Sequence, residues 1–342
     1  MMKKKHYPII LFILLHIGLM QTDATAKRKA KYVWKVATLA PDGIGWAKFA
    51  RDKFLKLIDE RSNGEVAIDM YWGGVMGDDE DYIAKMRIGQ LHGAGLSGAG
   101  TVMACPEMAV LELPFLFNGY NEVDYIREKL RTKISKIVEK NGYKMALWGD
   151  QDFDQIYSLK YEMRNPEDFR NSKFLTWYGA LEVEVLKALG SSPIHVNVPE
   201  VVISMRSGLC NVSISPAIWW VGAQLYTITK YVNPLPIRYS PALVIVTQKT
   251  WNSIPLKYKK EFDESIIQFE KEFCEYIRES NKKCLQGMID YGVKKVDMTS
   301  DEIEVFRKRT IPLWYKLAGK EYPKEILEEI LYHLKECRKK AK

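Results

Sequence analysis

The sequence is poor in the residues and motifs that build metal centres and redox sites. It contains five cysteines and five histidines in 342 residues, and none of the cysteines has CxxC or histidine-paired spacing. We therefore expect no metal site, and we interpret the cysteines as small buried apolar residues. The alternation of Asp150, Asp152 and Asp154 is similar to part of a calcium loop, but the glycine and glutamate that an EF-hand requires do not follow. We interpret this run as an exposed acidic hinge.

Motifs of enzymes are equally scarce. Ser97 does not stand in a G-x-S-x-G sequence, and the histidines are too scattered for a catalytic triad. Residues 93–98 contain G-x-G-x-x-G, but a dinucleotide site needs a hydrophobic strand before the glycines and a helix that opens in them. Here an amphipathic helical segment precedes the glycines, and Pro106 interrupts the segment that follows. We therefore expect no enzyme activity and no cofactor, and we interpret the glycines as a strand end that approaches a ligand.

Long hydrophobic runs are absent except for one near the N-terminus. Lysines at 3–5 precede an apolar run over 9–20, and Ala24-Thr25-Ala26 offers a small-x-small cleavage site. This run is too short for a membrane-spanning helix, which takes about 20 residues. The sequence therefore predicts a secretory signal peptide over 1–26, cleaved near Ala26, and export of the protein.

Positive charge is only moderately in excess. The chain has 51 lysines and arginines against 43 acidic residues, a formal net charge of +8. Basic clusters at 27–29 and 338–340 lie near the ends and are not interleaved with aromatic residues. We therefore expect no nucleic-acid partner, and the excess is a weak indication of contact with acidic surfaces.

What the sequence does contain is an alternation of short apolar strands and amphipathic helices. Its length suffices for two domains, and its composition of 47% apolar and 27% charged residues is that of a globular protein. Strand patterns at 31–38, 65–72 and 92–97 alternate with helix patterns at 45–61 and 78–88. This order is typical of a mostly parallel sheet.

Several segments resemble, in the same order, the solute receptors of tripartite ATP-independent periplasmic (TRAP) transporters. Residues 64–77 (GEVAIDMYWGGVMG) follow that family's pattern G-ELEVYPGGQLG, and residues 113–117 (LPFLF) match a family pentapeptide. Residues 165–175 (NPEDFRNSKFL) follow PEDL-KGLKIR, and residues 251–255 (WNSIP) follow the W--LP that precedes a long helix. The resemblance covers most of residues 31–292.

This resemblance implies an α/β, two-lobed fold like that of periplasmic binding proteins, with a ligand cleft between the lobes and a long helix bracing both. A helix predicted over 255–293 would be about 55 Å long, longer than one small domain is wide. The predicted lobes are residues 27–150 plus 238–265, and residues 151–237 plus 266–342. The resemblance also implies that the protein works in the periplasm, where it would close on one small-molecule ligand and pass it to the TRAP permease subunits in the membrane.

The chain departs from the family pattern where that pattern grips a carboxylate. Leu175 stands where the family has its carboxylate-binding arginine, and Asp154 falls near the position of a second family arginine. In the family's ENP turn, Ile214 and Ser215 replace the glutamate and the asparagine. Arginine forms a bidentate pair with a carboxylate that leucine cannot form. We therefore expect an apolar or uncharged ligand rather than a carboxylate.

Aromatic residues gather in the same part of the sequence, and each of them alone could equally belong to the core. Together, beside the missing arginine, they predict a cleft lined for an apolar or uncharged ligand. The candidate ligand-binding residues are Leu175, Trp177, Ser215, Trp219, Asp154 and Tyr157 from the second lobe, and Met76 and Gly95 from the first.

Three alternatives stay open at this point. The first is an ordinary organic-acid receptor, the second an exported enzyme that uses the glycine-rich segment or the acidic hinge. The third is an interaction protein that keeps the receptor fold with a filled cleft. Some family members are encoded with a tetratricopeptide-repeat partner and have departed from organic-acid ligands. This chain is more similar to that subgroup, which implies a periplasmic tetratricopeptide-repeat protein as a further partner.

Overall fold

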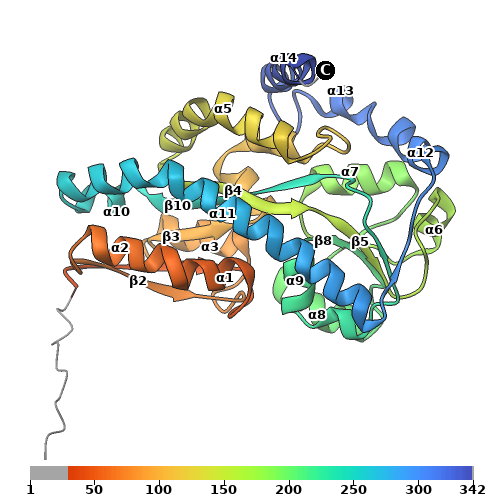
Figure 1. Cartoon of the computed structure of the whole chain (residues 1–342), viewed down its shortest axis with the longest axis horizontal. Helices are drawn as coiled ribbons and strands as arrows, with labels where there is room; N and C mark the ends of the chain where they lie inside the picture. Colours follow the sequence, from red (N-terminus) through yellow and green to blue (C-terminus); the bar gives the residue numbers. More distant parts are fainter. Residues whose placement is uncertain (1–29, 341–342) are drawn as a thin grey trace, which may run out of the picture.

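Two β-sheets, each flanked by helices, form two lobes that lie side by side (Figure 1). The computed structural model describes residues 30–340, so the predicted signal peptide lies outside the described residues. The first sheet has the strand order β2-β1-β3-β10-β4, and the second has the order β11-β9-β5-β8. The α/β, two-lobed fold expected from the sequence is confirmed.

The first lobe is built from three parallel strands with helical crossovers between them, as the alternating pattern predicts. Its early elements are β1 (Tyr32–Thr38), α1 (Gly45–Phe49), the π-helical turn η1 (Ala50–Phe54), α2 (Leu55–Arg61), β2 (Val66–Tyr71), α3 (Asp79–Arg87), β3 (Gly93–Leu96) and α4 (Gly98–Ala104). Helix α3 begins where Asp78 and Asp81 form a capping box. Then follow η2 (Pro106–Glu112) and α5 (Tyr120–Lys140).

Two extended segments cross between the lobes. Strand β4 (Tyr143–Phe153) pairs with β10 (Tyr239–Thr247) in the first sheet. Past Asp154, β5 (Gln155–Ser158) pairs in the second sheet with β8 (Val212–Ser215), β9 (Tyr231–Asn233) returns beside it, and β11 (Lys294–Lys295) closes the edge. The backbone N–H of Asp154 donates to the carbonyl of Arg238 at 3.0 Å, so the two crossings are bonded to each other. The two lobes are therefore joined by a pair of crossing segments that are hydrogen-bonded to each other.

The rest of the second lobe surrounds a short pair of parallel strands. Its elements are α6 (Pro166–Asn171), β6 (Leu175–Thr176), α7 (Ala180–Leu189), β7 (Ile194–His195), η3 (Val198–Glu200), α8 (Val201–Arg206), α9 (Ala217–Gly222) and η4 (Leu225–Thr227). The apolar run 173–178 yields only the two residues of β6. The backbone N–H groups of Trp177 and Tyr178 donate to the carboxylate of Glu182 and not to a neighbouring strand.

One long helix, α11 (Leu256–Tyr291), follows the short α10 (Gln248–Ser253) and runs across both lobes (Figure 1). Its 36 residues span about 54 Å. Asn281 on this helix donates to the carbonyl of Gln151 at 2.7 Å and accepts from the N–H of Ile218 at 2.9 Å. The helix is therefore bonded to a crossing strand and to the second lobe.

The C-terminal segment forms three helices: α12 (Ser300–Thr310), α13 (Leu313–Leu317) and α14 (Lys324–Lys340). The sequence placed residues 266–342 with the second lobe. Instead α14 lies against α5 of the first lobe (Figure 1), where Arg338 pairs with Glu122 at 2.8 Å. Amphipathic periodicity shows that α14 has an apolar face but does not identify the helix against which it packs.

The acidic run is buried, and its interpretation as an exposed hinge is wrong. Asp150, Asp152 and Asp154 have exposed fractions of 0%, 5% and 0%. Asp150 pairs with Arg127 and Arg278, Asp154 pairs with Arg238, and the hydroxyl of Tyr120 donates to Asp152 at 2.6 Å. These partners come from α5, α11 and the segment before β10, which are distant in the sequence.

All five cysteines are free thiols. Cys105, Cys210 and Cys274 are buried, as expected of small apolar residues, whereas Cys284 and Cys337 are only partly buried. No helix within residues 30–340 is both long and apolar enough to cross a membrane.

Candidate functional site

A cavity of about 90 Å³ lies between the lobes. Its wall comes from the carboxyl ends of β1 and β3, from the crossing strands, and from the segments around Trp177 and Trp219 of the second lobe. Five aromatic residues line it: Trp46, Trp177, Tyr178, Trp219 and Phe273. Among the described residues that line this cavity, none carries a charged side chain. We assign the site here because both lobes supply its wall.

The two lobes are closed upon each other around this cavity. The backbone N–H of Val198 in the second lobe donates to Asp78 Oδ2 in the first at 2.7 Å. A Cβ atom on Gly98 would overlap the ring of Tyr178, so the backbone of the first lobe touches the second. Closure to this extent requires a glycine at position 98.

Two adjacent tryptophans on α9, Trp219 and Trp220, contact different parts of the second lobe. Trp219 lines the cavity and meets Trp177 edge to face, with ring centroids 4.5 Å apart. Trp220 is fully buried and stacks on Tyr157 at 4.5 Å. The helical turn therefore presents one indole to the cavity and the other to the core.

Glu182 holds the strip of backbone that carries Trp177 and Tyr178. Its carboxylate accepts from the N–H of Trp177 at 3.0 Å, from the N–H of Tyr178 at 3.1 Å, and from the hydroxyl of Thr176. It is 2% exposed and stands in the first turn of α7. Glu182 is not among the candidate residues predicted from the sequence, although an acidic side chain in a first helical turn commonly reaches back to preceding N–H groups.

Arg238 completes this support. It donates to Glu182 Oε1 at 2.7 Å and to Asp154 Oδ2 at 2.9 Å, and it stacks on the ring of Tyr178 with 3.8 Å to the ring centroid. Burial raises the pKa of the Asp154 carboxyl, and the adjacent guanidinium opposes this rise. Arg238 is 5% exposed and does not line the cavity, so its charge is balanced inside the protein.

The structure brings three of the candidate residues into the cavity wall, namely Trp177, Trp219 and Gly95. The other five lie outside it. Leu175 is fully buried in an aromatic cluster with Tyr157, whose hydroxyl donates to Gln155. Ser215 is buried beside Pro216, which does line the cavity, and Asp154 is paired with Arg238. Met76 packs on the core of the first lobe.

Three further residues of the cavity wall, Trp46, Phe273 and Gln151, are not among the candidates predicted from the sequence. Trp46 and Phe273 lie on α1 and α11 and contribute to an apolar helical stripe, the pattern of ordinary core residues. Gln151 lies in the acidic run that was interpreted as exposed. These residues can be recognised as site residues only because they converge on one cavity from different elements of the fold. The periodicity of the sequence does not show this convergence.

The glycine-rich segment ends in a helix after all, since α4 opens at Gly98. Its first turn is occupied by Asp79, whose Oδ2 accepts from the N–H of Ser97 at 2.9 Å, from the Ser97 hydroxyl at 2.7 Å and from the N–H of Gly100 at 3.3 Å. Burial raises the pKa of Asp79 to about 7. A buried carboxylate thus stands where a dinucleotide phosphate would bind. Within residues 30–340, no group of His, Cys, Asp and Glu is arranged to hold a metal ion.

Comparisons with known proteins identify the family of the chain. The model described as bacterial extracellular solute-binding protein, family 7 (DctP) matches residues 36–321. The C4-dicarboxylate-binding periplasmic protein DctP of Rhodobacter capsulatus is 22% identical over 293 residues, which are 84% of this chain and 86% of that protein.

Solved structures show the same fold. The sugar acid binding protein DctPAm of Advenella mimigardefordensis, in complex with galactonate, has a TM-score of 0.84 at 19% identity, covering 90% of this chain and 99% of that one. A TRAP periplasmic solute binding protein of Ralstonia eutropha, with bound (S)-2-acetolactate, has a TM-score of 0.82 at 23% identity, covering 89% and 99%. Because the family model spans most of the chain, this protein belongs to the DctP family of bacterial extracellular solute-binding proteins, family 7.

Proposed function

We propose that this solute-binding protein works in the periplasm and captures a small uncharged ligand between its lobes. Closure over the ligand would prepare it for delivery to a TRAP membrane permease. The observation that carries the proposal is the cavity wall, which has no charged side chain among its described residues. A carboxylate enclosed there would lose its hydration without gaining an ionic partner, at a cost of several kcal/mol.

The polar groups of the wall support the same ligand class. Gln151 donates to the carbonyl of Pro241 at 2.8 Å and accepts from the hydroxyl of Tyr178 at 3.3 Å. Trp46 Nε1 donates to the carbonyl of Asp150 at 3.2 Å. Trp177 Nε1 is buried and has no hydrogen-bond partner within the described residues. Because these polar groups are bonded within the protein or buried, the wall offers a ligand mainly apolar contacts, and a largely apolar ligand fits it.

The size of the cavity limits the ligand. A dry cavity of about 150 Å³ holds a benzene molecule, and the cavity here has about 90 Å³. In this closed form the site therefore accommodates only a few non-hydrogen atoms. A larger ligand requires lobes that close less far.

The test compares acids with their neutral counterparts. Succinate and succinamide, and galactonate and galactonolactone, are added to the purified protein while its melting temperature is recorded. We expect the neutral member of a pair to raise the melting temperature, and Trp219→Ala to abolish the rise. Native mass spectrometry of the protein as purified then identifies any retained molecule. Stabilisation by the acids alone would overturn the proposal and support an organic-acid receptor.

A second candidate follows from the same small volume. The aromatic side chains leave only about 90 Å³ between the lobes, as in an interaction protein whose cleft is filled. Such a protein would be purified empty, and neither acids nor neutral compounds would shift its melting temperature. A periplasmic tetratricopeptide-repeat partner remains part of our proposal, and co-purification of such a protein from the native host would test it.

A further inference from the structure

A second and larger hollow lies on the first lobe, away from the interlobe cavity. It has a volume of about 940 Å³ and is formed by the start of β1, the segments that lead into β3 and β4, and helix α10. Strand β3 begins at this groove after His92 and ends at the interlobe cavity with Leu96. The two sites therefore lie at opposite ends of the same strand, about 13 Å long.

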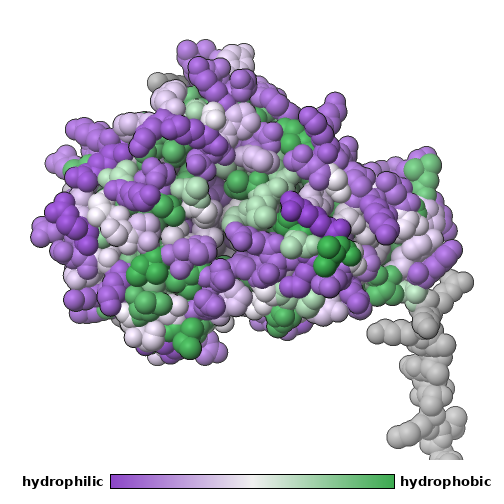
Figure 2. All heavy atoms as spheres, turned by 180° about the vertical axis from the view of Figure 1, so that it is seen from behind, coloured by the Kyte–Doolittle hydropathy of each residue, from purple (hydrophilic) through white to green (hydrophobic). Residues whose placement is uncertain are grey.

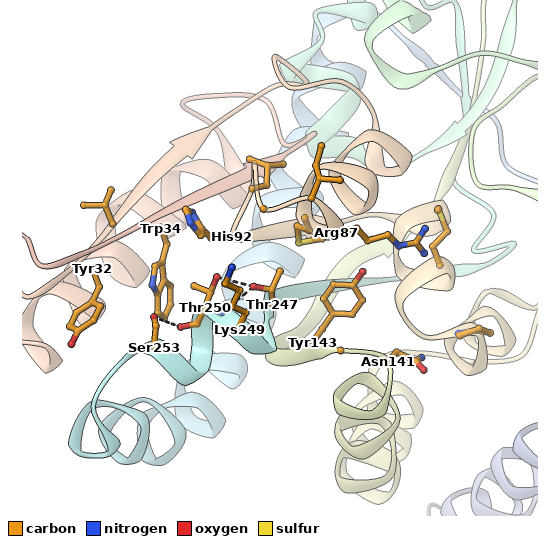
Figure 3. Close-up of a pocket in the computed structure, with 18 residues that line it drawn as sticks. Tyr32, Trp34, Arg87, His92, Asn141, Tyr143, Thr247, Lys249, Thr250 and Ser253 are labelled. Atoms are coloured by element: carbon orange, nitrogen blue, oxygen red, sulfur yellow. Dashed lines mark hydrogen bonds between the residues drawn. The ribbon is translucent and has the colours of Figure 1, made fainter.

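The groove is extended, and its floor is buried. Figure 3 shows its labelled side chains spread from Tyr32 at one end to Asn141 at the other, with His92 and Lys249 between them. Trp34, Leu91 and Thr250 line it with exposed fractions of 4%, 0% and 7%. A bilayer surface is flat and does not reach the floor of such a hollow. An extended polypeptide segment does.

The titratable side chains of the groove do not include an acid. Arg87 and Lys249 are its two cations, and neither forms a salt bridge with any residue within 30–340. No aspartate or glutamate is among the described residues that line it. An anionic partner would therefore meet two uncompensated positive charges and no repulsive carboxylate.

The neutral polar groups are also oriented as donors. His92 Nδ1 accepts from the N–H of Lys35 at 2.8 Å, so in the neutral ring the proton is assigned to Nε2. Trp34 Nε1 is buried and has no hydrogen-bond partner within the described chain. Both side chains line the groove, and His92 Nε2 is the N–H group that is left for a ligand rich in acceptors.

Apolar side chains project beside these donors. Val33, Ile88 and Met103 line the groove with exposed fractions of 45%, 70% and 41%. Figure 2 shows the molecule from behind, relative to Figure 1, and this face has small separate apolar patches on a mostly hydrophilic surface. Exposed apolar residues that share a groove with unpaired cations suit a segment in which acidic and apolar residues alternate.

We propose that this groove, lined by Arg87, Lys249, His92, Ile88 and Met103, binds an extended acidic and amphipathic segment of a partner protein. The chain's net charge of +8 disfavours a second copy of itself as the occupant. The segment would lie with its carboxylates against Arg87 and Lys249 and its apolar residues against Ile88 and Met103. The interlobe cavity would stay free for the solute.

The probe is a fluorescein-labelled peptide of about eight alternating glutamate and leucine residues, with a lysine–leucine peptide as the charge control. We expect fluorescence anisotropy to show saturable binding of the acidic peptide only. The variant Arg87→Glu/Lys249→Glu should weaken this binding about tenfold or more, and salt between about 0.02 and 0.3 M should weaken it in the wild type. The same double variant should leave the melting temperature unchanged.

Lys271→Glu/Lys308→Glu is the matched control, because it changes the net charge equally at two exposed lysines outside the groove. Equal loss in this control, or no loss in the groove variant, would overturn the proposal. Groove-dependent sedimentation with phosphatidylglycerol vesicles without peptide binding would overturn it in favour of a lipid. A dimer in solution that the groove variant dissociates would overturn it in favour of a second copy.

Discussion

At the scale of single residues, the charged side chains next to the cavity are paired with one another inside the protein. Arg238 is the arginine that stacks on the cavity residue Tyr178, and its charge is balanced by Glu182 and Asp154. A ligand carboxylate would have to compete with these two internal carboxylates. The proposed preference for an uncharged ligand therefore rests also on residues that do not themselves line the cavity.

The role of Glu182 leads to a stability prediction. Glu182→Gln removes the charge that accepts from Arg238 and from the backbone of Trp177 and Tyr178. We expect the free energy of unfolding to fall by about 1.5–3 kcal/mol in urea denaturation. Glu184→Gln, two residues along the same helix, removes only surface pairs with Lys187 and Lys316 and should cost at most about 0.5 kcal/mol. Equal losses would mean that Glu182 has no special role.

Leu175 gives a test of the ligand class. It is fully buried, so Leu175→Arg places a guanidinium without an acidic partner in an aromatic cluster and should destabilise the protein by several kcal/mol. A carboxylate that pairs with the new cation would recover part of the loss. We expect succinate or galactonate to raise the melting temperature of this variant. Leu186→Arg, equally buried on α7, should show no recovery. The same outcome for Leu175→Arg would show that an arginine at position 175, which lies outside the cavity wall, does not reach a ligand in the cavity.

At the scale of elements, local patterns predicted the helices well. The helices expected over 78–88 and 255–293 are observed as Asp79–Arg87 and Leu256–Tyr291, because a capping box and a left-handed Gly292 mark their ends in the sequence itself. Three features could not be predicted from the sequence. They are the groups that bond the backbone N–H groups after Thr176, the helix against which α14 packs, and the burial of the acidic run. Each of these depends on a partner many residues away.

The contact between α4 and the segment after β6 leads to a prediction about closure. Gly98→Ala adds a Cβ that would overlap the ring of Tyr178. The substitution favours helix α4 by up to about 1 kcal/mol, yet it prevents the lobes from closing fully. We expect small-angle X-ray scattering to give a larger radius of gyration for this variant than for the wild type. Gly119→Ala, whose Cβ would meet no atom within 4 Å, is the control, and coinciding curves for all three proteins would contradict the prediction.

At the scale of the whole molecule, buried acids couple stability to pH. Burial raises the pKa of Asp79 and of Asp152 to about 7 and that of Glu112 to about 8. In the unfolded chain such carboxyls ionise near pH 4, so between about pH 4 and 7 the folded protein binds more protons than the unfolded chain. These groups therefore lower the free energy of unfolding as the pH rises through that range. Burial alone would raise the pKa of Asp150, but Arg127 and Arg278 hold it below its ordinary value. The effect of Asp150 on stability is therefore opposite in sign, because it stabilises the folded protein at neutral pH and this stabilisation is lost as the pH falls.

Stability should accordingly be greatest at mildly acidic pH and decline towards pH 8, where the decline levels off. Asp152→Asn mimics the neutral carboxyl that accepts from the Tyr120 hydroxyl. The free energy of unfolding of this variant should therefore decline less steeply than that of the wild type between about pH 4 and 7, and the two declines should differ by a few kcal/mol at pH 7. Denaturant titrations at a series of pH values measure the slope. Asp69→Asn, at an exposed position of β2, should retain the wild-type slope. An unchanged slope in Asp152→Asn would show that Asp152 is ionised in the folded protein at neutral pH, and the pH dependence would then have to arise from Asp79 and Glu112.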